Sequence, residues 1–236
     1  MFHVKQWEVT MNSSLKSYLD KAKSCYELKE LERLGLTPEM DQRELILTYI
    51  CLILKWNDYS NLIPKNEFEN LFLRHFCDSL QPLLLFGFKK NATVLDIGSG
   101  GGFPFVPIRI FRPDLSFVVV ESNRKKMKFL KEVISVLKFD NINTFNFKVE
   151  KMEIPENKFN YVISRGIGSL QKFSQLAKPF LLSDGHMYTF KTKQFTNELD
   201  LITSNKEKDG VKISEIAEYD LGNQITGLNL VSLELL

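Results

Sequence analysis

The sequence has few residues of the kinds that build metal centres and disulfides. Its 236 residues include only three cysteines and three histidines, which are Cys25, Cys51, Cys77, His3, His75 and His186. The number of cysteines is odd, and no Cys-x-x-Cys spacing occurs. We therefore expect free thiols in a reducing compartment and no metal site.

Long apolar runs and a large excess of one charge are also missing. The longest apolar run, Leu45–Leu54, has ten residues and is interrupted by Thr48, whereas a membrane span needs about 20. The segment Met1–Thr10 lacks the apolar stretch of a signal peptide. The 31 Lys and Arg residues exceed the 29 Asp and Glu residues by a net charge of +2, which does not by itself indicate nucleic acid. We expect a cytoplasmic, monomeric protein without a membrane span.

The pattern of apolar residues changes near residue 90. Before it the chain has helical periods: one segment from Leu15 to Leu31, and a helix from the N-cap Thr37 to about Trp56. A break rich in turn residues follows, at Asn57, Asp58, Ser60, Asn61 and Pro64. The next predicted helix has an apolar stripe of Phe68, Leu71, Phe72, Phe76 and Leu80.

After residue 90, short apolar runs alternate with helical stretches. The predicted strands are 92–97, 117–120, 144–149, 161–163 and 187–190, the last after a turn at Asp184-Gly185, and the predicted helices are 104–111, 123–138, 170–180 and 195–205. Two final strands, 212–219 and 228–235, have no helix between them and are expected to pair antiparallel. The order predicts an α/β fold, a mainly parallel twisted sheet with helices on both faces. We expect residues 1–88 to form a helical extension packed on a domain of residues 89–236.

The strongest motif runs from Asp96 to Pro104 and reads Asp-Ile-Gly-Ser-Gly-Gly-Gly-Phe-Pro. It lies between an apolar strand and a helix, where the chain must turn sharply and let a ligand approach the backbone. A P-loop would need a Gly-Lys pair, and a dinucleotide site would need glycine where Phe103 stands. Asp96 with Gly98, Gly100 and Gly102 is the pattern usual in Rossmann-like class I methyltransferases. It predicts S-adenosylmethionine as the cofactor, and the Asp96 carboxylate suits a sulfonium cation.

Glu121 ends the next predicted strand, where a carboxylate can accept both hydroxyls of a ribose. Enzymes that bind NAD share this spacing, so Glu121 supports a ribose without choosing the cofactor. Phe103, an apolar ring beside the glycines, is a candidate to cover the cofactor.

The acceptor of the methyl group is narrowed by elimination. Exocyclic nitrogens of adenine or cytosine call for an Asn/Asp-Pro-Pro-aromatic motif after the fourth strand, where this chain has Ser164-Arg165-Gly166. Pyrimidine C5 needs a nucleophilic cysteine, yet all three cysteines precede residue 92. Guanine N7 carries no proton at neutral pH and needs no general base, and this sequence has no obvious candidate for one. Small-molecule acceptors also remain open.

An ordered set of motifs resembles a known family along nearly the whole chain. It comprises Met1-Phe2-His3-Val4-Lys5, Lys55-Trp56-Asn57 with Asn61-Leu62, Arg74-His75 with Asp78-Ser79, Asp96 to Gly100 with Gly102-Phe103-Pro104, Glu121-Ser122 with Lys125 and Phe129-Leu130, and Ser164-Arg165. With this set the chain resembles the RsmG or GidB family, the bacterial small-subunit rRNA guanine-N7 methyltransferases. The resemblance implies a guanine N7 of 16S rRNA as acceptor.

The resemblance also implies roles for single residues. Gly98 and Phe103 match cofactor contacts, and Val149 and Glu150 match a pair placed against its adenine ring. Arg165 matches an arginine that faces both the cofactor and the substrate pocket, and we assign it positioning rather than acid–base work. The chain departs from the family at Glu121, where Asp is usual, and at Phe105, Gly166, Thr192 and the C-terminus.

Two groups of polar residues have both a plain and a functional interpretation. Arg74 and Asp78, four residues apart, form either a simple helix ion pair or, with His75, a part of the substrate site. Lys125, Lys126 and Lys128 lie in a basic helix that is either a solvated face or a contact to rRNA phosphates.

Four hypotheses for function follow from the sequence, and the last of them is a nicotinamide oxidoreductase. The first is an S-adenosylmethionine-dependent methyltransferase that acts on 16S rRNA in the small ribosomal subunit. The second is a small-molecule methyltransferase with the same cofactor site. The third is a non-catalytic module that binds RNA or the cofactor.

Overall fold

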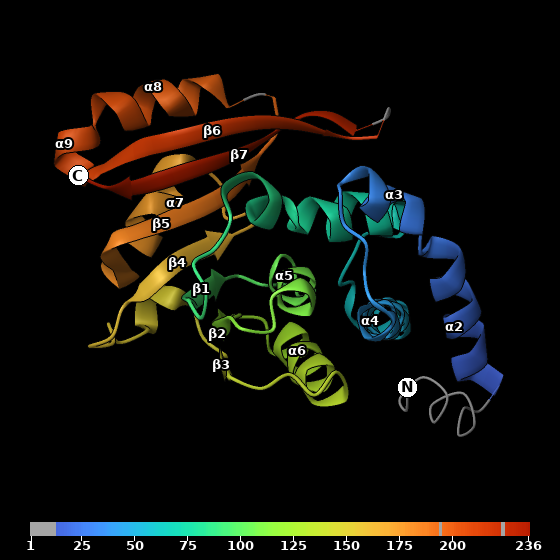
Figure 1. The fold of residues 1–236 in the computed structure, drawn as a ribbon. Coiled ribbons are helices and arrows are strands. Elements are labelled where there is room, and N and C mark those ends of the chain that lie inside the picture. The colour runs from blue at the N-terminus through green and yellow to red at the C-terminus, as the bar shows by residue number, and fades with distance from the viewer. Residues whose placement is uncertain (1–12, 194, 223–224) are drawn as a thin grey trace.

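The computed structural model describes residues 13–193, 195–222 and 225–236 and is organised around one sheet (Figure 1). The motif Met1 to Lys5 and the question of a signal peptide at Met1–Thr10 lie outside the described residues. In the part that is described, no helix is long and apolar enough to cross a membrane.

Helical segments fill the described chain before the sheet begins. They are α2 (Ser13–Cys25), α3 (Leu28–Arg33), α4 (Met40–Ser60), the 3-10 turn η1 (Lys65–Glu67), and the π-helical segments η2 (Leu71–Cys77) and η3 (Pro82–Phe86). The long helix α4 contributes Ile46, Ile50 and Ile53 to the core, all fully buried. The split at residue 88 into an extension and a domain stays a prediction.

Seven strands form the sheet in the order β3-β2-β1-β4-β5-β7-β6. The strands are β1 (Thr93–Ile97), β2 (Ser116–Val120), β3 (Ile142–Phe145), β4 (Phe159–Ser164), β5 (Leu181–Lys191), β6 (Val211–Leu221) and β7 (Ile225–Leu235). The first five strands pair in parallel, while β7 pairs antiparallel with both β5 and β6. The predicted mainly parallel sheet with an antiparallel end is confirmed.

Helices cover both faces of the sheet, as predicted. They are α5 (Phe105–Phe111), α6 (Arg124–Val136), α7 (Leu170–Ala177), α8 (Thr196–Ser204) and the short α9 (Lys206–Asp209). Val94 packs in one apolar cluster with residues of α4, α5 and α6, and its neighbour Leu95 packs in a second cluster with residues of α7 and α8. Figure 1 shows α4, α5 and α6 together on one side of the strands. The alternation of side chains along β1 therefore separates two cores.

Four predictions on the helical segment are wrong in detail. The stretch from Leu15 to Leu31 contains two helices, α2 and α3, rather than one. Helix α4 is capped by Glu39 rather than Thr37, because Glu39 and Gln42 form a reciprocal capping box. The same helix continues past Trp56 to Ser60, and the predicted turn residues Asn57, Asp58 and Ser60 are helical. The stripe from Phe68 to Leu80 lies on an irregular, partly π-helical segment.

Two predictions on strands are also wrong in detail. The strand expected at 144–149 is β3, which ends at Phe145, and Val149 lies in the 3-10 turn η4 (Val149–Lys151). Asn146 explains the early end, since its side-chain amide donates to the backbone carbonyls of Glu121 and Ser122. Asp184-Gly185 is no turn but a part of β5, where the pairing with β4 is irregular.

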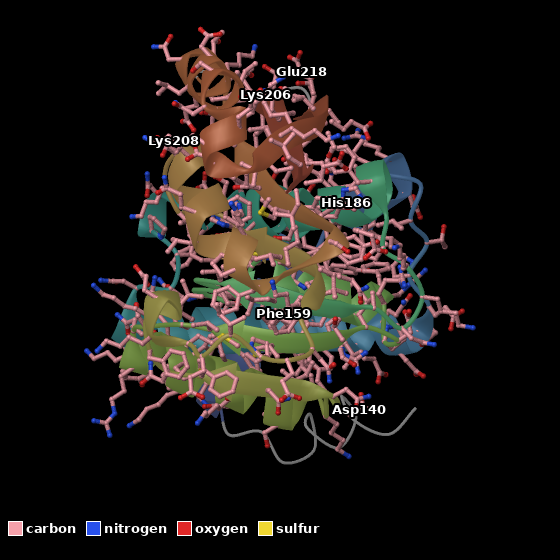
Figure 2. The ribbon with its side chains drawn as sticks, turned by 90° about the vertical axis from the view of Figure 1, so that its left-hand side faces the viewer. Asp140, Phe159, His186, Lys206, Lys208 and Glu218 are labelled. Atoms are coloured by element: carbon pink, nitrogen blue, oxygen red, sulfur yellow. The ribbon has the colours of Figure 1, made fainter. Side chains whose placement is uncertain are left out.

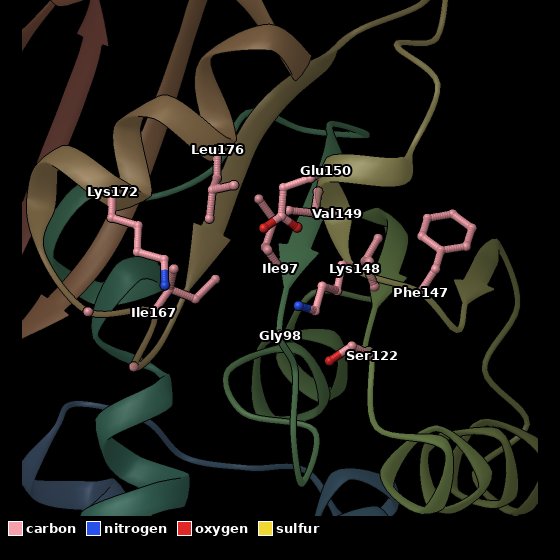
Figure 3. A pocket seen from close by; sticks show the side chains of 13 residues that line it. Ile97, Gly98, Ser122, Phe147, Lys148, Val149, Glu150, Ile167, Lys172 and Leu176 are labelled. Atoms are coloured by element: carbon pink, nitrogen blue, oxygen red, sulfur yellow. The ribbon is translucent and has the colours of Figure 1, made fainter.

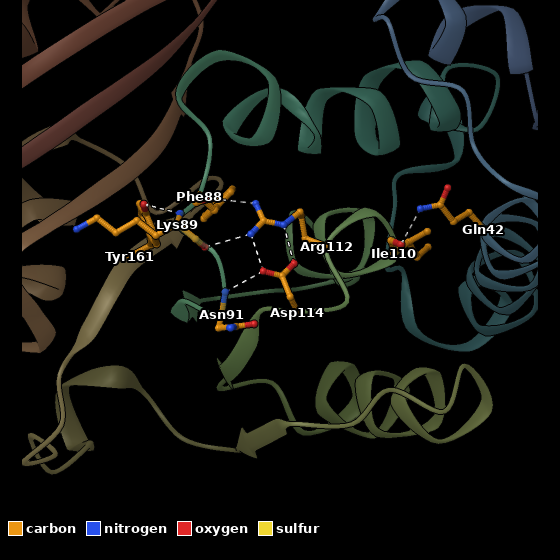
Figure 4. A network of polar contacts seen from close by, with 8 residues as sticks. All are labelled: Gln42, Phe88, Lys89, Asn91, Ile110, Arg112, Asp114 and Tyr161. Atoms are coloured by element: carbon orange, nitrogen blue, oxygen red, sulfur yellow. Dashed lines mark hydrogen bonds and ion pairs between the residues drawn. The ribbon is translucent and has the colours of Figure 1, made fainter.

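A polar network fixes the chain at the amino ends of β1 and β2 (Figure 4). Arg112 forms two bonds of 2.7 Å to Asp114 and donates to the carbonyls of Phe88 and Lys89. Asp114 also accepts from the backbone N–H of Asn91. These bonds hold the connection that leads from η3 into β1.

The outer strand β6 carries many exposed side chains, as its position at the sheet edge requires. In the view of Figure 2, Glu218 on β6 and Lys206 and Lys208 of α9 lie toward the top of the molecule, and Asp140 lies toward the bottom. Charged side chains on an edge strand oppose pairing with another chain.

Candidate active site

The turn after β1 needs its glycines for conformation and for packing. Gly98, Gly100 and Gly102 all have positive φ, from 59° to 92°. A Cβ atom on Gly102 would lie 2.8 Å from the Val106 side chain and 2.9 Å from the Tyr49 hydroxyl. Gly102 therefore lets the turn approach α4 and α5, while the exposed backbone of Gly98 lies at the carboxyl edge of the sheet.

Glu121 holds this turn in place. One carboxylate oxygen accepts from the Gly100 N–H at 2.9 Å, and the other accepts from the Asn123 N–H at 2.6 Å. The residue is 7% exposed. The carboxylate thus lies beside the glycine turn, as the ribose prediction requires, but in this structure it binds two backbone amides. The ribose role stays a prediction.

Asp96 is fully buried under the turn. Burial raises its pKa from 3.8 to about 8, and the nearby Glu121 adds to the rise, while Ser99 and the Phe105 backbone oppose it. Within the described chain, neither carboxyl oxygen has a hydrogen-bond partner of good geometry. A cation bound near this buried carboxyl group would favour its charged form and so lower its pKa.

A cavity of about 490 Å³ opens beside the turn (Figure 3). Its lining residues are Ile97, Gly98, Val120, Ser122, Phe147, Lys148, Val149, Glu150, Gly166, Ile167, Gly168, Lys172 and Leu176. Figure 3 shows Val149, Glu150 and Phe147 across the cavity from Lys172 and Leu176. Its volume is within the usual range of ligand pockets, about 300–1,000 Å³.

The predicted cofactor residues reach this cavity to different extents. Gly98, Val149 and Glu150 line it together, although the chain places the last two far from the first. Phe103 lies elsewhere: its ring packs against Tyr49 at 5.6 Å and against His75 at 5.3 Å between centroids. The expectation that Phe103 covers the cofactor receives no support from this packing.

The residues fit S-adenosylmethionine on three counts. Apolar side chains, Val149 and Leu176 among them, lie on opposite sides of the cavity, and the Glu150 carboxylate lies at its border (Figure 3). The bare backbone of Gly98 allows close approach. Asp96, just behind the turn, is a buried acid without a partner in the described residues.

Arg165 gathers the predicted substrate residues at the end of β4. Its Nε lies 2.9 Å from Asp78 Oδ2, its Nη1 lies 3.0 Å from His75 Nδ1, and its Nη2 donates to the Arg74 carbonyl at 2.7 Å. Asp78 thus pairs with Arg165, which lies 87 residues further along the chain, rather than forming the simple helix pair with Arg74. The four residues that the sequence grouped by resemblance lie together.

Two residues in this cluster have shifted pKa values. Burial and the charge of Arg165 lower the pKa of His75 to about 4, against the opposite effect of Glu67. His75 is therefore neutral at pH 7. Burial raises the pKa of Asp78 above its ordinary value, although Arg165 and Tyr219 both lower it. Such shifts are concentrated at functional sites.

A second cavity, of about 180 Å³, lies against this cluster. Arg74, Asp78, Arg165, Gly166, Phe190, Lys191, Thr192, Tyr219, Ile225 and Leu228 line it. Gly166 lines both this cavity and the larger one. The two cavities therefore meet at the residue next to Arg165, at the sheet edge where α/β folds bind ligands.

The remaining predicted residues lie on the surface. Lys125 and Lys128 are exposed and Lys126 is partly exposed on the first turns of α6, which Asn123 caps. They are available for an external anion. Among the described residues, no group of His, Cys, Asp or Glu is arranged to hold a metal ion.

Five residues at or near the two cavities were not predicted from the sequence. Lys148 and Lys172 line the larger cavity, and Glu67, Tyr219 and Tyr49 make hydrogen bonds to residues of the predicted site or its glycine turn. Glu67 and Tyr219 bind His75 and Asp78 through their side chains. Tyr49 donates to the Gly101 carbonyl at 2.6 Å. A single polar residue without a local motif carries no signal in one sequence, so only the fold shows these contacts.

Comparison with known proteins identifies a family for this chain. The family model described as GidB, rRNA small subunit methyltransferase G, matches residues 42–225. Proteins named ribosomal RNA small subunit methyltransferase G from Chromobacterium violaceum and Lachnoclostridium phytofermentans are 35% and 31% identical to this chain. The first match covers 80% of this chain and 88% of the relative, and the second covers 82% and 81%.

Solved structures show the same fold at low identity. A SAM-dependent methyltransferase from Aquifex aeolicus matches with a TM-score of 0.54 at 16% identity, over 71% of this chain and 93% of its own. A TehB-like SAM-dependent methyltransferase from Corynebacterium glutamicum also matches with a TM-score of 0.54, at 14% identity, over 78% and 99%. The Rossmann-like class I methyltransferase fold is confirmed. Since the family model spans α4, the glycine turn and the Arg165 cluster, the chain belongs to the rRNA small subunit methyltransferase G family, GidB.

Proposed function

We propose that this protein transfers the methyl group of S-adenosylmethionine to N7 of a guanine in the 16S rRNA of the small ribosomal subunit. The observation that carries the proposal is the meeting of two cavities at Gly166, with Arg165 in the wall of the smaller one. The family to which the chain belongs supports the choice of small-subunit rRNA.

The larger cavity is the proposed cofactor site. Gly98 offers close backbone approach, Val149 and Glu150 form the wall proposed for the adenine ring, and Glu121 is the proposed partner of the ribose. Asp96 lies buried behind the turn, and a bound sulfonium would favour the charged form of its carboxyl group. S-adenosylmethionine, when bound, supplies a methyl group on a sulfonium that becomes a neutral thioether on transfer.

The acceptor nitrogen attacks with its in-plane lone pair, so no base is needed. Neither His75, which is neutral and bonded at both ring nitrogens, nor Asp78, which binds Arg165 and Tyr219, is free to take a proton. The protein's part is to position the base and to exclude water.

Arg165 is the proposed positioning residue on the acceptor side. A guanidinium carries five N–H groups, and Arg165 uses three of them in the described contacts. One N–H at each terminal nitrogen remains for a phosphate or a base edge, and the flat group can also stack on an extruded base. It should not bind N7 itself, since that would occupy the attacking lone pair.

Transfer of tritium from labelled S-adenosylmethionine tests the proposal. The acceptors are small subunits from cells that lack the gene, naked rRNA, and a fraction of small metabolites. We expect label in rRNA that elutes with 7-methylguanosine after digestion to nucleosides. Label in the metabolite fraction would favour a small-molecule methyltransferase, and binding without any transfer would favour a non-catalytic module.

A further inference from the structure

Arg165 is held by two side chains that are themselves each bonded to a further residue. His75 and Asp78 both come from the segment that begins in η2, while Arg165 follows β4. A π-helical segment is frequent at functional sites. The side chains behind His75 and Asp78 come from two other parts of the chain, η1 and β6.

The first of these partners, Glu67, stabilises the tautomer of His75 that the contact with Arg165 requires. Arginine can only donate, so the contact of 3.0 Å from Arg165 Nη1 makes His75 Nδ1 the acceptor. A neutral imidazole then carries its proton on Nε2, which lies 2.6 Å from Glu67 Oε2. The Glu67 carboxylate, 26% exposed, stabilises this tautomer and also the orientation of the ring.

The second partner, Tyr219, completes the Asp78 carboxylate. Its hydroxyl donates to Asp78 Oδ1 at 2.5 Å, while Oδ2 binds Arg165 Nε at 2.9 Å. The Asp78 side chain is 7% exposed, so removing one donor leaves a buried oxygen without a partner. Tyr219 also lines the smaller cavity, beside Arg165 and next to the place proposed for the methyl acceptor.

We infer that Glu67 and Tyr219 are positioning residues for methyl transfer. They act through His75 and Asp78 to hold the Arg165 guanidinium so that two of its N–H groups remain available to the methyl acceptor. The inference rests on the proposed function, because it takes Arg165 to contact the acceptor. It adds a role for the C-terminal strand pair, since β6 brings Tyr219 to the site.

Single-turnover methylation of small subunits with saturating cofactor measures this role. We expect Glu67→Ala and Tyr219→Phe each to lower the rate about tenfold, because loss of one buried hydrogen bond misplaces Arg165. Affinity for S-adenosylmethionine should stay the same. Matched controls are Glu69→Ala, an exposed acid nearby, and Tyr188→Phe, a buried tyrosine of β5 that bonds the Gly87 carbonyl.

A conservative variant separates positioning from general stability. In His75→Asn the amide oxygen takes the place of Nδ1 as the acceptor for Arg165 and needs no help from Glu67. We expect Glu67→Ala to lower the rate in the wild type and to have little further effect in the His75→Asn background. An equal loss from Glu67→Ala in both backgrounds would overturn the role assigned to Glu67.

Nitrogen-15 NMR of the His75 ring provides a readout that does not depend on catalysis. We expect the Nε2–H tautomer in the wild type and a mixture of tautomers in Glu67→Ala. An unchanged ring spectrum, or wild-type rates in Glu67→Ala and Tyr219→Phe, would overturn the inference alone. Absence of methyl transfer by the wild-type protein would instead overturn the proposed function.

Discussion

Arg112 and Arg165 lie at opposite edges of the sheet and are held in different ways. Arg112 precedes β2 and binds Asp114, two residues away, through two parallel bonds, and the backbone carbonyls of Phe88 and Lys89 take two more. Arg165 follows β4 and makes one bond each to Asp78, His75 and the Arg74 carbonyl. The partners of Arg165 all come from a segment about 90 residues earlier in the chain.

The two carboxylates differ in the same way. The Arg112 guanidinium and the Asn91 N–H hold the pKa of Asp114 well below its usual range. Burial raises the pKa of Asp78 in spite of its contact with Arg165. The pair of Arg112 and Asp114, at the amino ends of the strands, thus favours stability. The pair of Arg165 and Asp78, at the carboxyl ends, keeps a charge buried at an electrostatic cost. That cost is expected where a group is held ready for a ligand.

The largest expected effect is on catalysis, at Arg165. Arg165→Ala should lower single-turnover methylation of small subunits by about 100-fold, because the acceptor is no longer positioned. Arg165→Lys should restore little, since a point charge lacks the planar fork. Near-normal transfer by Arg165→Ala would assign this residue to the same structural role as Arg112.

The second effect is on stability, at Arg112. Arg112→Ala should reduce the free energy of unfolding by about 2 kcal/mol, because it removes several partly buried hydrogen bonds. The rate per folded molecule should stay within twofold of the wild type, a bound of about 0.4 kcal/mol. Urea unfolding and single-turnover assays on one preparation measure both. A catalytic loss as large as that of Arg165→Ala would remove the contrast between the two edges.

Asp96 extends the contrast to the cofactor side. Its pKa is raised in the folded protein, so the folded state binds a proton that the unfolded state releases above pH 3.8. This group's contribution to stability is therefore full below pH 3.8 and is lost as the pH rises to about 8. Asp96→Asn lacks this loss, so its stability relative to the wild type should grow between pH 5 and pH 8.

The same variant should bind S-adenosylmethionine about tenfold more weakly, since it removes a charge that favours a cation. Urea unfolding at several pH values and calorimetry with the cofactor measure the two effects. Unchanged affinity would place Asp96 among the purely structural residues.

The smallest effect is expected for the basic helix. If Lys125, Lys126 and Lys128 contact phosphates, replacing them with glutamine should reduce the slope of log affinity against log salt by about 2. Cofactor affinity should not change. Lys206 and Lys208 of α9 and Lys212 of β6, the strand at the other end of the sheet, form the control set. If the salt dependence does not change, these lysines of α6 form a solvated surface rather than a contact to rRNA.

The sequence predicted the sheet well because its signals are local. Alternating side chains such as Val94 and Leu95 belong to two cores, and the glycines after β1 have the positive φ that their turn needs. The turn predicted at Asp184-Gly185 is absent because glycine occurs not only in turns but also where two segments pack closely. A Cβ atom at Gly185 would lie 2.7 Å from the Asn160 carbonyl oxygen, so this glycine permits an irregular strand rather than a turn.

The candidate site was predicted less completely, because its contacts join distant segments. Resemblance to the family supplied Arg74, His75, Asp78 and Arg165, but neither spacing nor periodicity shows that they touch. Tyr219 reaches Asp78 across 141 residues of sequence, and no local pattern marks it. Phe103 was assigned to the cofactor from its place beside the glycines, yet its ring packs toward Tyr49 and His75.

The central claim is that the carboxyl edge around Arg165 positions guanine N7 of small-subunit rRNA. Nucleoside analysis of that rRNA, from cells that lack the gene and carry wild-type, Arg165→Lys or Arg112→Lys protein at equal levels, tests it most directly. We expect 7-methylguanosine with the wild-type and Arg112→Lys proteins and little with Arg165→Lys. Full 7-methylguanosine with Arg165→Lys, or the same amount with no protein at all, would contradict it.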